Sequence, residues 1–232
     1  MDFEKNFLVS VLKLTKDGQV PEEIIAKDAR VGLGVASRIL FHLEKDGIIS
    51  LSSGVVELSD LGRLRLAVKA ISLGVDSERI SSFLSWQEFE SVSGIALERN
   101  GYNVVKNLRF KGSGRRWEID LVGFRKPLVL CIDCKHWHKS IVQSSLKKIV
   151  EEQTERTRAF CEVLPNILQQ LECSRWDKAK FLPTIVTLLP GYLKFYEDVP
   201  IVSVLQVQDF LLQIPAFVGS VKCFAKNFSH LV

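Results

Sequence analysis

Apolar positions in the first part of the chain follow a helical period. Residues 3–16 and 35–45 each carry apolar side chains at spacings of three and four, which predicts two amphipathic helices. Between them, Pro21 followed by two glutamates is typical of the first turn of another helix. Ser59 is suited to cap a fourth helix, which we expect to end near residue 73.

A short hairpin is predicted between the third and fourth helices. Apolar runs at residues 48–51 and 55–58 flank the turn Ser52-Ser53-Gly54. The order of helix, helix-turn-helix and hairpin, with the junction Leu43-Glu44-Lys45-Asp46-Gly47-Ile48-Ile49, resembles the winged-helix family. The resemblance implies a DNA-binding or protein-docking module over residues 1–74. The short polar segment that follows is expected to be a linker over residues 75–85.

The pattern changes after residue 85. A helical stripe over residues 86–100 is followed by extended segments at 102–110, 117–124 and 128–135. A helix followed by three strands predicts an α/β (α+β overall) domain over residues 86–232.

Composition excludes several protein classes. Hydrophobic residues make up 47% of the 232 residues and charged residues 25%, which is typical of a globular protein and not of a disordered one. The N-terminus lacks a signal-peptide pattern and no apolar run is long enough to span a membrane, so we expect a cytoplasmic protein with reduced cysteines. The net charge of +4 says little until the basic residues are located.

Four charged residues lie on two adjoining predicted strands. Alternation places Asp133 and Lys135 on one face of the strand at 128–135, and Glu118 and Asp120 on one face of the preceding strand. If the strands pair, Asp120 lies close to Asp133. Carboxylates beside a lysine form a site for a hard divalent cation and a phosphate. The alternative is a structural salt-bridge cluster on a half-exposed sheet.

The motif from Glu118-Ile119-Asp120 to Cys131-Ile132-Asp133-Cys134-Lys135-His136-Trp137 resembles the PD-(D/E)xK nuclease superfamily, nearest its Mrr-like restriction endonuclease branch. The helix that carries Phe89-Glu90 and ends at Leu97-Glu98-Arg99-Asn100-Gly101-Tyr102 matches the opening helix of that branch. The resemblance covers residues 86–212 and implies a restriction-endonuclease-like αβββαβ fold with a central mixed sheet. It also implies a helix after Lys135, further strands at 181–189 and 201–204, and a short closing helix at 207–212. It implies metal-dependent hydrolysis of phosphodiester bonds in DNA.

Carried over residue by residue, the resemblance makes Asp120 and Asp133 ligands of Mg²⁺ or Mn²⁺, with Glu90 adding a carboxylate. Lys135 would orient the attacking water and stabilise charge on the phosphate. Two positions depart from the commoner pattern, because Ile119 replaces a proline and Asp133 replaces a glutamate. Glu118 and Gln153 are accessory candidates.

Two clusters of basic residues are candidates for contact with DNA phosphates. One follows the predicted helix-turn-helix, and the other crowds the first hairpin of the second domain, where an ordinary solvated turn is the alternative. The candidates are Arg30, Arg38, His42, Lys45, Lys106, Arg109, Lys111, Arg115 and Arg116.

A zinc site at Cys131, Cys134, His136 and His138 is disfavoured, because a strand directs the two thiols to opposite faces. The absence of a Gly-rich phosphate loop indicates no nucleotide cofactor, and the resemblance allows a homodimer. The leading hypothesis is therefore a divalent-metal-dependent DNA endonuclease that acts in restriction or in DNA repair and recombination. The alternative is a catalytically silent nuclease fold that regulates by binding DNA or a protein.

Overall fold

The computed structural model describes residues 2–135, 143–167, 176–188 and 194–228. The chain divides into two compact units, with the division between Phe89 and Glu90. Among the helices of the described ranges, none has the length and apolar character needed to cross a bilayer.

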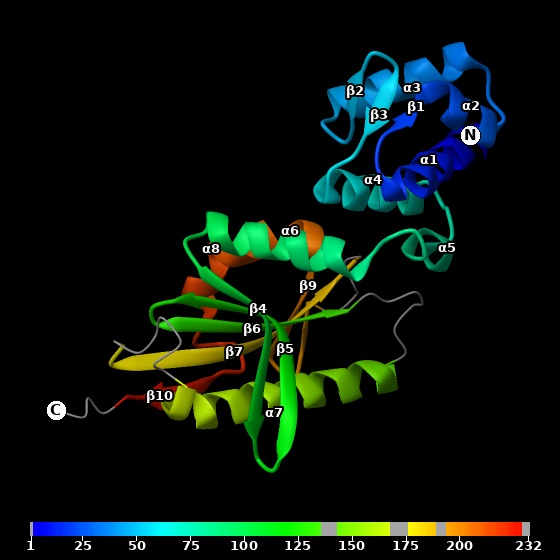
Figure 1. Ribbon diagram of the computed structural model, residues 1–232. Coiled ribbons are helices and arrows are strands. Elements are labelled where there is room, and N and C mark those ends of the chain that lie inside the picture. Colours follow the sequence, from blue (N-terminus) through cyan, green and yellow to red (C-terminus); the bar gives the residue numbers. More distant parts are fainter. Residues whose placement is uncertain (1, 136–142, 168–175, 189–193, 229–232) are drawn as a thin grey trace. The chain divides into compact units, whose positions relative to one another are not determined.

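The first unit consists of short helices and a small three-stranded sheet in the order β1-β3-β2 (Figure 1). Its elements are α1 (Asp2–Leu14), η1 (Thr15–Asp17), β1 (Val20–Pro21), α2 (Glu22–Ala29), α3 (Leu33–Lys45), β2 (Ser50–Ser52), β3 (Val55–Glu57), α4 (Asp60–Ser72) and α5 (Ser77–Ser81).

The predicted helix starts and stops explain most of these boundaries. The Gly62 amide donates a hydrogen bond to the Ser59 hydroxyl, so Ser59 caps α4 as expected. Pro21 lies just before α2 and not inside it, because Val20 and Pro21 pair with β3 as a third strand that the sequence did not predict. Apolar residues of the predicted stripes, such as Phe7 and Leu40, are fully buried.

The segment predicted as a linker packs within the first unit. It contains α5, and Ile80 and Leu84 are buried. The buried Arg63 donates to the Phe83 carbonyl at 2.7 Å and forms an ion pair with Glu88. Because unpaired charges are costly to bury, these contacts hold the segment in place.

The second unit is built on a mixed seven-stranded sheet in the order β4-β5-β6-β7-β9-β8, with β10 paired to β7. The strands are β4 (Asn103–Gly112), β5 (Arg115–Arg125), β6 (Leu128–Lys135), β7 (Lys178–Thr187), β8 (Phe195–Tyr196), β9 (Val199–Ser203) and β10 (Phe224–Asn227). The pairs β4–β5 and β5–β6 are antiparallel, whereas β6–β7 and β7–β9 are parallel. The predicted mixed sheet in an α+β domain is thereby confirmed.

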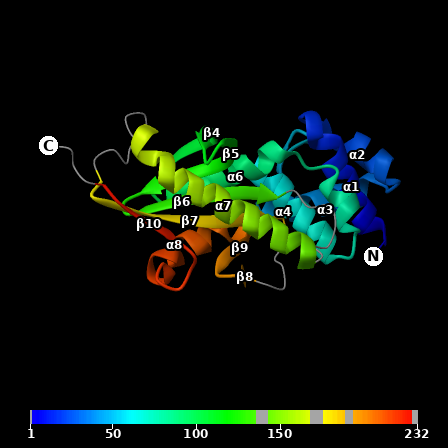
Figure 2. The same ribbon diagram turned by 90° about the horizontal axis from the view of Figure 1, so that it is seen from below.

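Helices cover both faces of this sheet. The helices α6 (Trp86–Arg99) and α8 (Val207–Phe217) lie on one face, and α7 (Gln143–Ile167) crosses the other (Figures 1 and 2). A short 3-10 turn, η4 (Val204–Gln206), precedes α8. Phe160 of α7 and Phe181 of β7 are fully buried in one core cluster between α7 and the sheet. The described order α6-β4-β5-β6-α7-β7 agrees with the expected series.

Candidate functional site

Asp120 and Asp133 lie where β5 and β6 stop pairing. The antiparallel ladder runs from Arg125 opposite Leu128 to Leu121 opposite Ile132. Asp120 and Asp133 are the next residues on their strands. There the Asp120 carboxylate accepts a hydrogen bond of 2.8 Å from the Cys134 amide, so a side chain replaces the strand-to-strand bond.

Strand alternation changes phase at this point. Trp117 and Ile119 pack in the core cluster beside α7, but so do Val122 and Phe124. A regular strand directs odd and even positions to opposite faces, so the side chains of β5 must change face between Ile119 and Val122, although its register against β4 stays the same. On β4, Asn107 faces this irregularity with a left-handed φ of 51°. Regular alternation, which led us to place Glu118 and Asp120 on one face, therefore does not continue through Asp120.

Asp133 is buried and is contacted by two cations. The Lys135 ammonium lies 2.9 Å from Asp133 Oδ2, and the Arg156 guanidinium donates to Oδ1 at 2.7 Å. Sequence reasoning did not single out Arg156, which comes from α7. Two charge-assisted contacts offset the cost of burying the Asp133 carboxylate.

Gln153 connects α7 to β6. Its amide nitrogen donates to the Cys131 carbonyl at 2.6 Å, and its amide oxygen accepts from Arg156 at 2.9 Å. Gln153 is almost completely buried. In the sequence, Gln153 is a polar residue within the apolar stripe of α7 that includes Val150 and Phe160. This signal could have identified Arg156, which follows one turn later on the same helix.

The electrostatics of the pair favour a bound cation. Burial, followed by the neighbouring Asp133, raises the pKa of Asp120 to about 6. The Cys134 amide, Lys135 and Arg156 oppose this rise in the pKa of Asp120. A positive ion placed between the two carboxylates would remove the unfavourable interaction between them.

Glu90 lies in a different environment. It is buried on α6, and this burial raises its pKa, while Lys106 and Asn107 lower it. Within the described ranges, no three His, Cys, Asp or Glu side chains come together as a group that could hold a metal ion. The structure therefore brings together Asp120 and Asp133 with Lys135, and does not add Glu90 to them as a third ligand.

The remaining accessory and zinc candidates have other surroundings. Glu118 forms an exposed ion pair with Arg109 at 2.9 Å. Burial raises the pKa of the Cys131 and Cys134 thiols, and Cys131 packs in the core cluster beside α7. His136 and His138 lie outside the described residues.

Three of the five basic candidates of the second unit lie at the β4–β5 turn, whereas Lys106 and Arg109 lie further along β4. Lys111, Arg115 and Arg116 line a pocket of about 440 Å³ together with Gly112 and Gly114. The Arg115 guanidinium stacks 3.4 Å from the centre of the Trp117 ring. This stacking positions the turn while Lys111 and Arg116 stay exposed.

In the first unit, the candidates on α3 face solvent. Arg38, His42 and Lys45 are exposed along this helix, and Arg30 is exposed at the end of α2. An exposed basic helix face is a surface that DNA phosphates can contact.

The chain is similar in part to several known proteins. An uncharacterized protein of Archaeoglobus fulgidus is 27% identical over 131 residues, which cover 56% of this chain and 92% of that protein. A crystal structure of a protein of unknown function, AF1548, aligns with a TM-score of 0.28 at 17% identity over 43% of this chain and 46% of its own. The protein VC1899 from Vibrio cholerae aligns with a TM-score of 0.37 at 12% identity over 93% of this chain and 50% of its own.

The chain thus spans about half the length of these two solved structures. A family model described as the nuclease-related domain matches residues 85–203, just over half of the 232 residues and the part that contains β5, β6 and α7. On this match, the chain belongs to the nuclease-related domain (NERD) family.

Proposed function

We propose that this protein is a divalent-metal-dependent DNA endonuclease of the PD-(D/E)xK superfamily, nearest the Mrr-like branch. The observation that carries the proposal is the convergence of Asp120, Asp133 and Lys135 where β5 and β6 separate, in a chain of a nuclease-related family. The proposed catalytic domain begins at residue 86.

Asp120 and Asp133 would hold Mg²⁺ or Mn²⁺. Two adjacent carboxylates fit a hard cation, because Mg²⁺ commonly binds proteins through one or two carboxylates and keeps several water ligands. The raised pKa of Asp120 supports this choice, since a cation would favour its ionised form. Such an ion supplies Lewis-acid stabilisation of a phosphate and activation of water.

Lys135 is suited to the phosphate and its attacking water. Its ammonium is held 2.9 Å from Asp133 Oδ2, so its position is fixed beside the two carboxylates. A fixed ammonium would stabilise negative charge that develops on the phosphate and would orient a water molecule. Arg156 would act through Asp133 by holding that carboxylate, which makes it a positioning residue.

The first unit would position the DNA as a winged helix. Its element order, the hairpin β2–β3 and the exposed basic face of α3 support this assignment. The basic β4–β5 turn of the second unit would add contacts to the phosphate backbone. DNA is therefore the proposed partner.

Cleavage assays with paired variants test the proposal. We expect nicking or cutting of DNA with Mg²⁺ or Mn²⁺, abolished by EDTA and reduced at least about 100-fold by Asp133→Asn or Lys135→Ala. The exposed Asp209→Asn and Lys178→Ala are matched controls that should keep full activity. Metal-dependent cleavage that survives the first pair would contradict the site.

The substrate panel should include linear, branched, modified and single-stranded DNA. If DNA binds with full affinity but none of these substrates is cut, and calorimetry detects no metal binding, the catalytically silent alternative replaces the endonuclease.

A further inference from the structure

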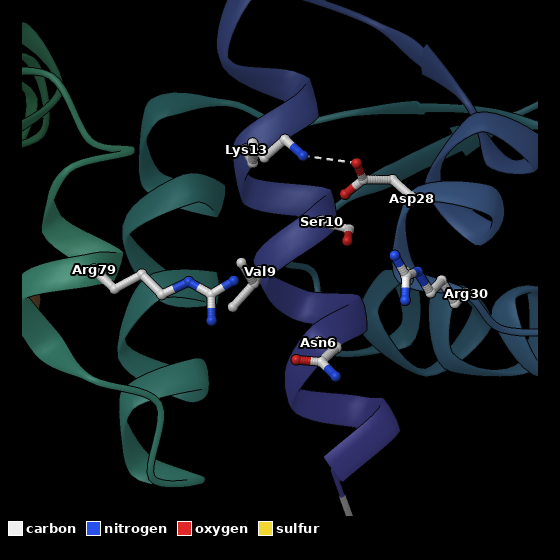
Figure 3. Close-up of a pocket in the computed structure, with 8 residues that line it drawn as sticks. Asn6, Val9, Ser10, Lys13, Asp28, Arg30 and Arg79 are labelled. Atoms are coloured by element: carbon white, nitrogen blue, oxygen red, sulfur yellow. Dashed lines mark hydrogen bonds and ion pairs between the residues drawn. The ribbon is translucent and has the colours of Figure 1, made fainter.

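A second polar pocket lies within the first unit, where α1, the end of α2 and α5 meet (Figure 3). Its volume is about 320 Å³, which is in the range of small-molecule sites. Ser10 and Lys13 come from α1, Arg30 follows α2, and Arg79 belongs to α5. Figure 3 shows Arg30 and Arg79 directed toward α1 from two sides.

The pocket has an excess of positive charge. Lys13 donates to the Asp28 carboxylate at 2.6 Å, and this bond, followed by one from Ser10, lowers the pKa of Asp28. Asp28 thus stays ionised and neutralises Lys13. The guanidinium groups of Arg30 and Arg79 form no ion pair with any residue of the described ranges. Two positive charges remain.

The backbone at Arg30 supports a role for its side chain. Arg30 caps the end of α2 in the left-handed conformation, with φ 55° and ψ 44°. Glycine is the usual residue at this position, because a side chain there is strained. Residues held in such conformations often serve binding sites, where the surrounding structure fixes their direction.

We propose that this pocket binds a phosphate monoester. A monoester carries close to two negative charges at neutral pH, which matches the two unpaired arginines, whereas a phosphodiester within a DNA strand carries one. Planar guanidinium groups bind phosphate oxygens in pairs of hydrogen bonds. The monoester belongs either to a small phosphorylated molecule or to the 5′-phosphate end of a DNA strand.

Binding to the full chain tests the site with defined probes. Calorimetry would measure the Kd of inorganic phosphate and of a deoxynucleoside 5′-monophosphate. Fluorescence anisotropy would compare two oligonucleotides of one sequence, with a 5′-phosphate or a 5′-hydroxyl. Tighter binding of the 5′-phosphate strand identifies a DNA end, and saturable binding of the mononucleotide with equal affinity for both strands identifies a small molecule.

Variants connect the binding to the pocket. Arg30→Gln and Arg79→Gln should each weaken phosphate-dependent binding at least about tenfold, because each removes charge-assisted hydrogen bonds. Arg65→Gln, an exposed arginine on α4, should leave it unchanged. Because Arg79 is exposed on α5, Arg79→Gln keeps the test valid even if Arg30→Gln disturbs α2. If no probe binds, or if both pocket variants bind like the wild type, the proposal is wrong.

Discussion

The Asp133 carboxylate contacts both the Lys135 ammonium and the Arg156 guanidinium, and we expect Arg156 to affect metal binding. Arg156 donates to Oδ1 of the carboxylate that we propose as a metal ligand. A bound Mg²⁺ or Mn²⁺ would compete with Arg156 for that oxygen and would be repelled by its charge. Arg156 would therefore reduce metal affinity, while it stabilises the metal-free carboxylate.

We predict that Arg156→Ala lowers the Kd for Mn²⁺ by about tenfold, which corresponds to about 1.4 kcal/mol. Isothermal titration calorimetry would measure the change. Arg158→Ala is the matched control, because Arg158 lies on the same helix but over the Phe224 ring. A Kd that stays the same or rises in Arg156→Ala would show that the arginine does not compete with the ion.

Asp120 makes the metal-free protein less stable as pH rises. Its pKa is raised from 3.8 to about 6, so the folded state binds the proton more tightly than the unfolded state. The stability present at low pH is then lost as pH rises through the folded pKa. We predict that Asp120→Asn increases the free energy of unfolding by about 2–3 kcal/mol at pH 8, and by much less at pH 4.

Urea denaturation in EDTA between pH 4 and pH 8 would measure this dependence. The exposed Asp209→Asn should give no such trend. A gain in stability that does not vary with pH would point to packing and not to the charge of Asp120.

At the residue scale, the sequence predicted the contact of Asp133 with Lys135, because a regular strand places residues two apart on one face. It could not predict that the side chains of β5 change face near Asp120, because this change depends on the irregular backbone of the partner strand at Asn107. Arg156 was missed because its contact with Asp133 spans 23 positions along the chain, and nothing local encodes it.

At the scale of elements, the helices of the first unit were predicted well because Ser, Gly and Pro mark their ends. The strands β1 and β10 were not predicted. β1 has two residues, too few for alternation, and β10 pairs Phe224 with Phe181 from a distant part of the chain. Pairing of such short segments is decided by tertiary contacts and not by local pattern.

Gly62 on α4 packs closely against the chain that follows α3, and Gly34 on α3 is a control position with open space around it. A Cβ at Gly62 would lie 2.2 Å from the Ile48 carbonyl oxygen, whereas a Cβ at Gly34 meets no atom within 4 Å. We predict that Gly62→Ala destabilises the first unit by about 3 kcal/mol, because backbone must move to admit the methyl group. Gly34→Ala should stabilise α3 by about 0.5 kcal/mol.

Thermal melting followed by circular dichroism would compare the two variants. Equal melting temperatures would mean that α4 can move away from Ile48 at little cost, and that this contact does not fix the helix.

At the scale of the whole molecule, the net charge of +4 combines separate clusters of acidic and of basic residues. In the second unit, the carboxylates Asp120 and Asp133 lie where the pairing of β5 with β6 ends, while Lys111, Arg115 and Arg116 gather at the β4–β5 turn. Acidic groups thus stand where a cation would bind, and basic groups where a phosphate backbone would approach. Such separation of charge suits an enzyme that acts on a polyanion through metal ions.

The number of DNA phosphates that the β4–β5 turn contacts can be measured from the salt dependence of DNA binding. Each phosphate neutralised by a lysine or arginine releases counterions and adds about 0.9 to the slope of log K against log salt concentration. We predict that the double variant Lys111→Gln and Arg116→Gln lowers this slope by about 1.8 on duplex DNA. Fluorescence anisotropy over a series of salt concentrations would measure it with EDTA present to prevent cleavage.

The double variant Lys178→Gln and Lys194→Gln removes the same charge from exposed positions on β7 and beside β8. If binding depended only on net charge, both double variants would weaken it alike at low salt. Contact at the turn instead requires that the slope falls for the Lys111 and Arg116 variant alone. An equal fall in both would assign DNA binding to the overall field of the protein, and the basic turn would then be an ordinary solvated loop.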